Sequence, residues 1–282
     1  MSKDFPVAVS CLWLADNLAS PDVRVVDGSW FMPGADLNPE EEYQREHIIG
    51  AVFFNIDEIA DQNTGLPHSF PSLELFTSRV RKLGLGDGNR LVVYDRLGLF
   101  SAARVWWMFK VMGHEDVAIL DGGLPKWINE GRPTSDRPAP RRERHFTPRM
   151  NNILIRDADQ VQSILGRDDY VIIDARSPER FRGEADEPRP GIRKGHIPGA
   201  VNVPVGELLT EDCCFKDVDM LRARFQEAGV APNKRAICYC GSGVTACIIA
   251  AALELTGHRS WSVYDGSWTE WGGRHDLPIE QP

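Results

Sequence analysis

The sequence contains no run of apolar residues that approaches the roughly 18 needed to cross a membrane. The N-terminal stretch from Phe5 to Leu18 is too short for a span and carries Asp16. No segment has the features of a secretory signal peptide. We therefore expect a cytoplasmic protein that neither spans a membrane nor is exported.

The sequence has no block of like charges long enough to suggest a charged tail. With 32 Lys and Arg against 41 Asp and Glu, the formal net charge is −9. A chain with this charge and no basic patch is poorly suited to nucleic acid or to an anionic membrane surface. We expect neither as a partner.

The cysteines lack both CxxC pairs and the spacing of a disulfide framework, and no His/Cys cluster has the spacing of zinc ligands. This usage is typical of reduced thiols in a cytosol-like compartment. We predict no disulfide framework and no metal site. The cysteines are Cys11, Cys213, Cys214, Cys238, Cys240 and Cys247.

What the sequence does contain is an ordinary globular composition, with 42% hydrophobic and 26% charged residues. Such a chain can bury a substantial core. Its 282 residues exceed the usual size of one domain, about 100 to 200 residues, and favour two units of similar size.

Three segments of the first half recur in the second half in the same order, at a spacing of about 145 residues. Residues 47–52 match 196–201, residues 89–95 match 233–240, and residues 113–127 match 257–271. A period of this length is too long for a solenoid, so each copy is expected to be a complete domain with its own core.

The segment from Gly131 to Arg149 is rich in Pro and Arg and lacks apolar periodicity, as is typical of a linker. We place the boundary near residue 150. The predicted domains are residues 1–135 and 153–282, joined by a linker at 136–152.

Within each copy, short β-rich runs alternate with longer segments of helical period. This order predicts an α/β fold of two tandem domains, each a parallel sheet flanked by helices, with ligands beyond the carboxyl ends of the strands. The clearest predicted strands are Val23–Val26, Leu91–Tyr94, Val171–Asp174 and Ala236–Tyr239, and the clearest helices Leu73–Leu83 and Val244–Leu255.

The loop between the last of these strands and the last helix carries the most chemistry. It starts with Cys240, at the carboxyl end of a strand, and Gly241 and Gly243 let several N–H groups converge in front of the helix. Those donors and the helix-end field favour a thiolate, and the same cradle suits a persulfide.

A cysteine can also be a small buried apolar residue, and glycines can merely form a turn. The strand, loop and helix context favours the chemical interpretation for Cys240. The other cysteines suit the structural one, since Cys238 and Cys247 fall in a strand and a helix, and Cys213 and Cys214 in a connecting loop.

The sequence Cys-Gly-Ser-Gly-Val-Thr at 240–245, His-Ile-Pro-Gly-Ala at 196–200 and the duplication resemble the 3-mercaptopyruvate sulfurtransferases, a branch of the tandem rhodanese family. The resemblance runs over nearly the whole chain. It implies a sulfurtransferase that needs no metal or organic cofactor. It also implies that the loop residues Gly241, Gly243, Val244 and Thr245 contribute to binding the substrate.

The first copy has Asp95 where the second has Cys240, and a carboxylate cannot relay sulfur. Residues 96–100 follow it and are not expected to form a glycine cradle for an anion. As in tandem rhodaneses generally, the first copy should be inactive and should contribute residues to a cleft between the domains.

Thiosulfate-using rhodaneses typically have an Arg-Lys pair after the cysteine, whereas this chain has Gly241 and Ser242. The loop therefore offers no cation to an inorganic dianion. By resemblance, Arg180 and Arg189 hold the carboxylate and keto oxygen of 3-mercaptopyruvate, a task that suits guanidinium groups. On the bare sequence, either could equally be a surface arginine.

The family's proton relay of serine, histidine and aspartate maps onto Ser242, His68 and Asp57. Both first-copy residues are expected in loops, with Asp57 orienting His68 and His68 exchanging a proton through Ser242. A loop histidine can also be a solvated surface residue. Many relatives have aspartate where this chain has Asn55.

The predicted cycle passes sulfur from 3-mercaptopyruvate to Cys240, releases pyruvate, and then passes the sulfur to a thiol, thioredoxin or cyanide. The nearest alternative is a thiosulfate sulfurtransferase. A phosphatase or arsenate reductase of rhodanese-like fold needs a longer loop ending in arginine, where this chain has Thr245. A binding module without chemistry would not need Cys240.

Overall fold

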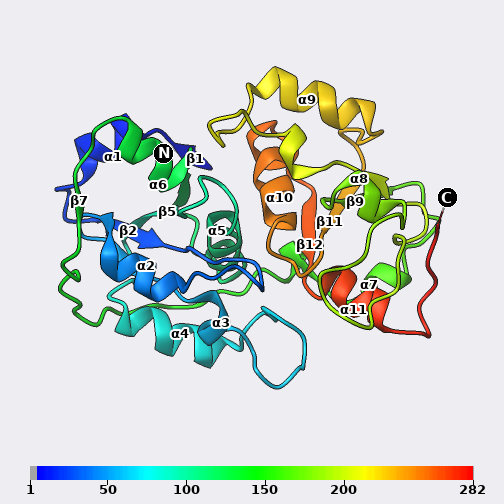
Figure 1. Ribbon diagram of the computed structural model, residues 1–282, viewed down its shortest axis with the longest axis horizontal. Helices are drawn as coiled ribbons and strands as arrows, with labels where there is room; N and C mark the ends of the chain where they lie inside the picture. The colour runs from blue at the N-terminus through cyan, green and yellow to red at the C-terminus, as the bar shows by residue number, and fades with distance from the viewer. Residues whose placement is uncertain (1–4, 282) are drawn as a thin grey trace. The chain divides into compact units, whose positions relative to one another are not determined.

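The structure of the protein is a computed structural model that describes residues 5–281. These residues form two compact units (Figure 1). One comprises residues 5–61, 70–151 and 211–214, and the other comprises 62–69, 152–210 and 215–281. Among these residues, no helix is long and apolar enough to span a bilayer.

The first unit is built on a five-stranded sheet in the order β1-β6-β5-β2-β4, in which every pair is parallel. The same unit contains a separate, two-stranded antiparallel sheet formed by β3 and β7. The elements are β1 (Ala8–Val9), α1 (Cys11–Asn17), β2 (Val23–Asp27), α2 (Pro39–Arg45), β3 (His47–Ile48), β4 (Val52–Phe53), α3 (Ile56–Ile59), α4 (Leu73–Lys82), β5 (Arg90–Tyr94), α5 (Ala102–Val111), β6 (Val117–Leu120), α6 (Gly123–Asn129) and β7 (Thr134–Ser135).

The second unit repeats the plan with a parallel sheet in the order β10-β9-β11-β12-β8. The elements are the 3-10 helix η1 (Asn152–Leu154), β8 (Ile155–Arg156), α7 (Ala158–Gln162), β9 (Tyr170–Asp174), α8 (Pro178–Phe181), β10 (Val201–Asn202), the 3-10 helix η2 (Val205–Glu207), α9 (Val218–Glu227), β11 (Arg235–Tyr239), α10 (Ala246–Leu255), β12 (Trp261–Tyr264) and α11 (Ser267–Gly273).

The two sheets match strand for strand, which confirms the α/β fold that the alternating runs predict. β11 is the third of five strands and pairs with β9 and β12 on either side. Helix α10 begins at Ala246 rather than at the predicted Val244, because Val244 and Thr245 complete the loop after β11.

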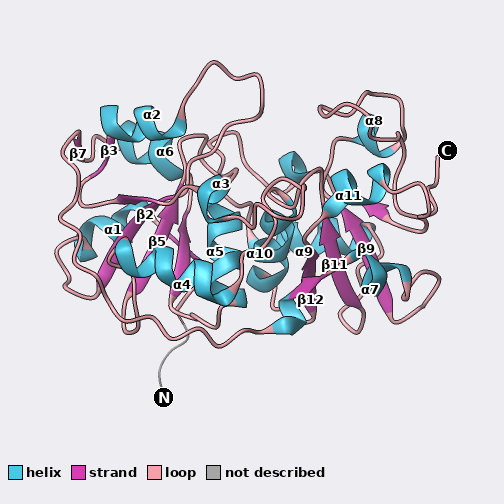
Figure 2. Ribbon diagram, turned by 90° about the horizontal axis from the view of Figure 1, so that it is seen from below, coloured by secondary structure: helices cyan, strands magenta, loops and turns pink. Residues whose placement is uncertain are grey.

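Side chains along β11 alternate between the two faces of its sheet, as the period of a strand requires. Ile237 and Tyr239 pack in a core with α7 and α11. The other face of the sheet is covered by α10, which contacts β11 and β12 and is itself packed against α9 (Figure 2). Seven consecutive residues of α10 are fully buried, so the helix is apolar all round.

Residues 142–149, which we call the strap, form neither helix nor strand and lie against the first unit. The amide of Asp87 donates to the carbonyl of His145 at 2.8 Å, and the amide of Arg149 donates to Met112 at 2.8 Å. At the centre of the strap, Phe146 is only 3% exposed. Its ring lies 5.7 Å, 6.1 Å and 6.0 Å from those of Phe76, Phe109 and His114.

Replacing Phe146 with alanine is expected to lower the free energy of unfolding of the first unit by about 3 to 5 kcal/mol, the usual cost of deleting a buried phenylalanine. Urea unfolding, with hydrogen exchange to separate the two units, measures the loss. Phe146→Leu keeps most of the volume and should cost under about 1.5 kcal/mol. Equal stability of the two variants would show that the ring does not fill the core.

Candidate functional site

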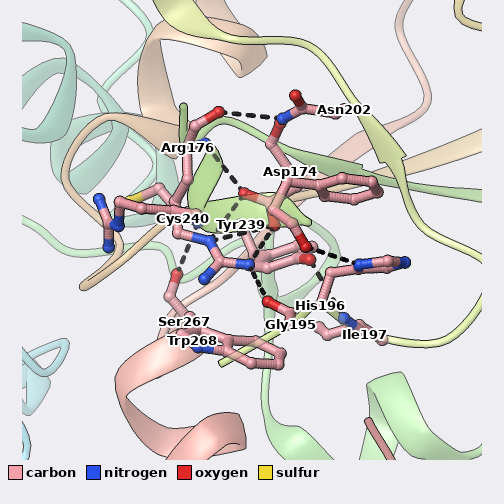
Figure 3. A network of polar contacts seen from close by, with 12 residues as sticks. Asp174, Arg176, Gly195, His196, Ile197, Asn202, Tyr239, Cys240, Ser267 and Trp268 are labelled. Atoms are coloured by element: carbon pink, nitrogen blue, oxygen red, sulfur yellow. Dashed lines mark hydrogen bonds and ion pairs between the residues drawn. The ribbon is translucent and has the colours of Figure 1, made fainter. Parts of the chain in front are cut away.

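Cys240 is the first residue after β11 and is 2% exposed. The start of α11 holds its backbone on both sides: the Cys240 amide donates to Ser267 Oγ at 3.2 Å, and its carbonyl accepts from the Trp268 amide at 2.9 Å (Figure 3). The next carbonyl, of Gly241, accepts from the Thr269 amide at 2.8 Å. The loop is therefore fixed to α11 at the point where the thiol begins.

Ser267 is a functional candidate that the sequence reasoning missed. It adopts a left-handed backbone with φ 51°, which is strained for serine, and its hydroxyl also donates to the Tyr264 carbonyl at 2.8 Å. The matching residue of the first copy is Gly123, with φ 54°. The sequence offered one signal for Ser267, namely that the second copy has serine at a position where the first copy has glycine.

The loop after Cys240 presents backbone N–H donors that no acceptor in the described part of the chain uses. Within residues 5–281, the amides of Ser242, Val244, Thr245 and Ala246 donate to no protein acceptor. Gly243 has φ 78°, a conformation that favours glycine and turns the loop into the helix. These four donors lie at the N-terminus of the buried helix α10, where an anion is stabilised.

The first copy shows what such a loop binds. One carboxylate oxygen of Asp95 accepts from the amides of Phe100, Ser101 and Ala102 at 2.7 to 2.9 Å, and the other accepts from Leu97 at 2.9 Å. Residues 96–100 do not form a glycine cradle, but with Ser101 and Ala102 they do bind an anion, which the sequence reasoning did not expect. They lack the second copy's glycine pattern, but their amides still converge in front of α5.

Burial raises the pKa of the Asp95 carboxyl, and the hydrogen bonds from the four amides oppose that rise. The Asp95 carboxylate thus accepts the hydrogen bonds that the amides of this loop offer. The anion-binding position of the first copy is therefore occupied by the chain's own side chain. In the second copy a thiol occupies the corresponding chain position, and a thiol cannot accept four hydrogen bonds as a carboxylate does.

Arg180 lies against the loop after Cys240, since a Cβ placed on Gly241 would be 3.0 Å from Arg180 Nη2. It extends from the short helix α8, and Glu187 binds it through both carboxylate oxygens. Sequence reasoning used Glu187 only as part of a motif and missed this ion pair. Arg189 lies half-buried in the loop two residues later.

Glu187 is held in turn by Arg176, whose Nη1 donates to Glu187 Oε1 at 2.7 Å. Arg176 is 2% exposed and also donates to both carboxylate oxygens of Asp174 and to the Gly195 carbonyl (Figure 3). Its guanidinium stacks over the Trp268 ring, 4.4 Å from the centroid. Arg176 is a positioning residue that the sequence reasoning did not single out.

The three predicted relay residues belong to different parts of the fold. Ser242 is 8% exposed in the loop after Cys240. His68 is 6% exposed, has a left-handed φ of 59°, and belongs to the same compact unit as Ser242. Asp57 belongs to the first unit, where its Oδ2 accepts from Trp30 Nε1 at 2.9 Å.

Asp57 is not in a loop as expected but in the first turn of α3. The side chain of Asn55 caps that helix by accepting from the amides of Asp57 and Glu58 at 3.1 and 3.3 Å. The asparagine thus starts a helix in a segment that the sequence suggested was irregular.

All six cysteines are free thiols. Cys238 and Cys247 are fully buried in β11 and α10, and Cys213 and Cys214 lie in a loop, as predicted. Burial raises the pKa of the Cys238 thiol well above its ordinary value, which makes it inert at neutral pH.

Comparison with known proteins agrees with this arrangement. The rhodanese-like domain model matches residues 10–130 and 157–274. The 3-mercaptopyruvate sulfurtransferase of Escherichia coli is 41% identical, with 95% of each chain covered. The mitochondrial thiosulfate/3-mercaptopyruvate sulfurtransferase 1 of Arabidopsis thaliana is 41% identical over 99% of this chain and 79% of that protein.

The crystal structure of SseA from Escherichia coli, described there as a rhodanese fold, matches with a TM-score of 0.86 at 38% identity. The match covers 93% of this chain and 99% of that one. The chain thus belongs to the rhodanese family, with two tandem domains. It is a sulfurtransferase, and the resemblance to the 3-mercaptopyruvate branch is confirmed.

Two substitutions at Ser267 separate strain from hydrogen bonding. Ser267→Gly relieves the left-handed backbone, by roughly 1 kcal/mol, but removes the acceptor for the Cys240 amide. Because the change also removes the hydrogen bond to the Tyr264 carbonyl, we expect thermal stability below that of the wild type but above that of Ser267→Ala. Sulfur transfer should fall about tenfold, measured as kcat with cyanide as acceptor. Ser267→Ala keeps the strained backbone and also loses the hydroxyl. It should therefore lose both thermal stability and sulfur-transfer activity. Full activity in Ser267→Gly would show that the hydroxyl does not position Cys240.

Proposed function

We propose that the chain transfers sulfur from 3-mercaptopyruvate through a persulfide on Cys240. The observation that carries the proposal is the set of four unused amides in front of α10, matched in the first copy by amides that bind the Asp95 carboxylate. A persulfide on Cys240 adds a second, negatively charged sulfur that can accept those hydrogen bonds.

In the first step, the Cys240 thiolate attacks the thiol sulfur of 3-mercaptopyruvate. A sulfur–sulfur bond forms, the carbon–sulfur bond breaks, and its electron pair leaves on the pyruvate enolate. The proton of the substrate thiol ends on the enolate carbon, so the products are pyruvate and the Cys240 persulfide anion. A second nucleophile then removes the outer sulfur and regenerates the thiolate.

Arg180 and Arg189 are proposed to bind the substrate's carboxylate and keto oxygen. The closeness of Arg180 to Gly241 supports this role. Glu187 already accepts from Arg180, so the substrate shares a guanidinium whose orientation is fixed in advance. Gly241, Gly243, Val244 and Thr245 supply the backbone that surrounds the transferred sulfur.

Ser242, His68 and Asp57 are proposed as the proton relay. The left-handed backbone of His68 supports this assignment, because strain of that kind gathers at functional sites. In this scheme His68 carries the proton between the substrate thiol and the enolate through the Ser242 hydroxyl, and Asp57 fixes the orientation of His68.

The acceptor is proposed to be a small thiol, thioredoxin or cyanide, in a cytoplasmic setting that keeps the thiols reduced. Thiosulfate is the second candidate donor, since the name of the Arabidopsis relative includes it. The loop after Cys240 has no cationic side chain for a sulfonate, which favours the carboxylate donor.

Intact mass spectrometry tests the persulfide. After incubation with 3-mercaptopyruvate and without acceptor, we expect a gain of one sulfur, about 32 Da, that cyanide removes. Cys240→Ser should gain nothing, whereas Cys247→Ser should behave as the wild type. A gain that survives in Cys240→Ser would place the chemistry elsewhere.

Substitution of Arg180 tests donor recognition. Arg180→Leu is expected to raise the KM for 3-mercaptopyruvate at least about tenfold, because a charge-assisted hydrogen bond is lost. The rate at which cyanide discharges the preformed persulfide should change far less.

Arg182→Leu is the matched control, because Arg182 is exposed and pairs with Glu184. If Arg180→Leu left the KM for 3-mercaptopyruvate unchanged, or if the wild type strongly preferred thiosulfate, the proposed donor would be wrong.

A further inference from the structure

Four side chains of alternating charge form a continuous series in the second unit, and the last of them lies beside the loop after Cys240. Asp174 Oδ2 accepts from Arg176 Nη2 at 2.6 Å (Figure 3). Arg176 Nη1 in turn donates to Glu187 Oε1 at 2.7 Å, and the same oxygen lies 3.3 Å from Arg180 Nε. We call these four residues the charge network.

The charge network is neutral as a whole, because its two guanidinium groups are matched by two carboxylates. The side chains of Asp174 and Arg176 are fully buried and that of Glu187 is 5% exposed, whereas that of Arg180 is 21% exposed. Water and salt screen buried charges less than exposed ones, so the negative charge of Glu187 acts strongly on Arg180. Arg180 is therefore the member that a small anion can reach, and its charge is already balanced.

Glu187 occupies only one of the two edges of the Arg180 guanidinium that can hold a carboxylate. Its two oxygens accept from Nε and Nη2, which leaves Nη1 and the second hydrogen of Nη2 as donors. Within residues 5–281, Arg180 has no other acceptor. The remaining edge faces the loop after Cys240, since a Cβ on Gly241 would lie 3.0 Å from Nη2 and 3.9 Å from Nη1. Arg180 thus offers directed N–H donors to the loop while its charge is cancelled from behind.

The first unit shows that the fold does not require the charge network. Asp27 and Asp174 end the equivalent strands β2 and β9, and each accepts from the amide two residues later at 2.9 Å. That later residue is Arg176 in the unit that carries Cys240 but Ser29 in the other unit. Serine serves this turn as well as arginine does, so Arg176 and the glutamate it binds are features of the reactive copy alone.

From this geometry we infer that Glu187 determines which sulfur donors the Cys240 site accepts. It holds Arg180 by one edge and balances its charge. The other edge then suits the single charge of a carboxylate-bearing thiol, and the site attracts an inorganic dianion such as thiosulfate only weakly. The inference rests on the proposed function, because it explains how that site favours 3-mercaptopyruvate over thiosulfate. Glu187 acts through Arg180 and is a positioning residue.

The charge of Glu187 and its geometry can be separated by two substitutions. Glu187→Gln removes the charge but keeps an oxygen acceptor on a side chain of the same shape, whereas Glu187→Asp keeps the charge on a shorter side chain. The quantity to compare is the ratio of kcat/KM for thiosulfate to kcat/KM for 3-mercaptopyruvate, with cyanide as acceptor. Both donors load the same Cys240, so the ratio does not depend on the folded fraction of a variant.

We expect the ratio to rise about tenfold in Glu187→Gln, because removing one negative charge beside Arg180 favours a dianion over a monoanion. The rise should come mainly from a lower KM for thiosulfate and should shrink as ionic strength increases. In Glu187→Asp the ratio should stay within about twofold of the wild type, even where both rates fall. Glu184→Gln is the matched control, because Glu184 is exposed and pairs with Arg182, and it should leave the ratio unchanged.

An unchanged ratio in Glu187→Gln, or an equal rise in Glu187→Asp, overturns the inference and leaves 3-mercaptopyruvate as the donor. A wild type that prefers thiosulfate contradicts the proposed donor itself, and the inference with it. If Glu187→Gln yields no active protein, inhibition of the wild type decides the question. Sulfate, an unreactive dianion, should then compete with 3-mercaptopyruvate more weakly than pyruvate, which carries one carboxylate. Stronger inhibition by sulfate than by pyruvate overturns the inference.

Discussion

The structure depends on one interaction, the hydrogen bonding of backbone amides at a strand–loop–helix junction to a single negative group. In the first unit that group is the Asp95 carboxylate, which the chain supplies itself. In the second unit the same junction leaves four amides without an acceptor among the residues that the structure describes. The fold therefore contains one satisfied and one unsatisfied version of the same site, and only the second can stabilise a charge that appears during a reaction.

Much of the second site's surroundings serves to keep that junction rigid. Ser267 holds the Cys240 amide from one side, and the buried pair of Arg176 and Asp174 holds Glu187 and, through it, Arg180. The Arg176 guanidinium donates both to the buried Asp174 carboxylate and to Glu187, which also binds Arg180. It therefore has little freedom to reorient. The charges near Cys240 are consequently fixed before any substrate arrives, which lowers the reorganisation that binding requires.

The sequence allowed the fold to be predicted because its signals are local. The β-rich run at 236–239, the helical period after it and the glycines between them define the Cys240 loop without tertiary information. Ser267, 27 residues away, and Arg176 act through contacts between distant segments that no periodicity reveals. The anion-binding role of the loop after Asp95 was missed for a related reason. Backbone amides can contribute to an anion site whatever the side chains of their residues. Asp57 was placed in a loop because a four-residue helix capped by Asn55 leaves too short a pattern to detect.

The strap bears on what counts as one module of this chain. The segment between the two copies is more than a linker, because its Phe146 completes the core of the first unit. The two units therefore differ in what completes their cores, since the first depends on a segment outside the repeat. A fragment cut at residue 135, where the repeat alone would end the first domain, would expose Phe76, Phe109 and His114, whereas one extended to residue 151 retains its own cover.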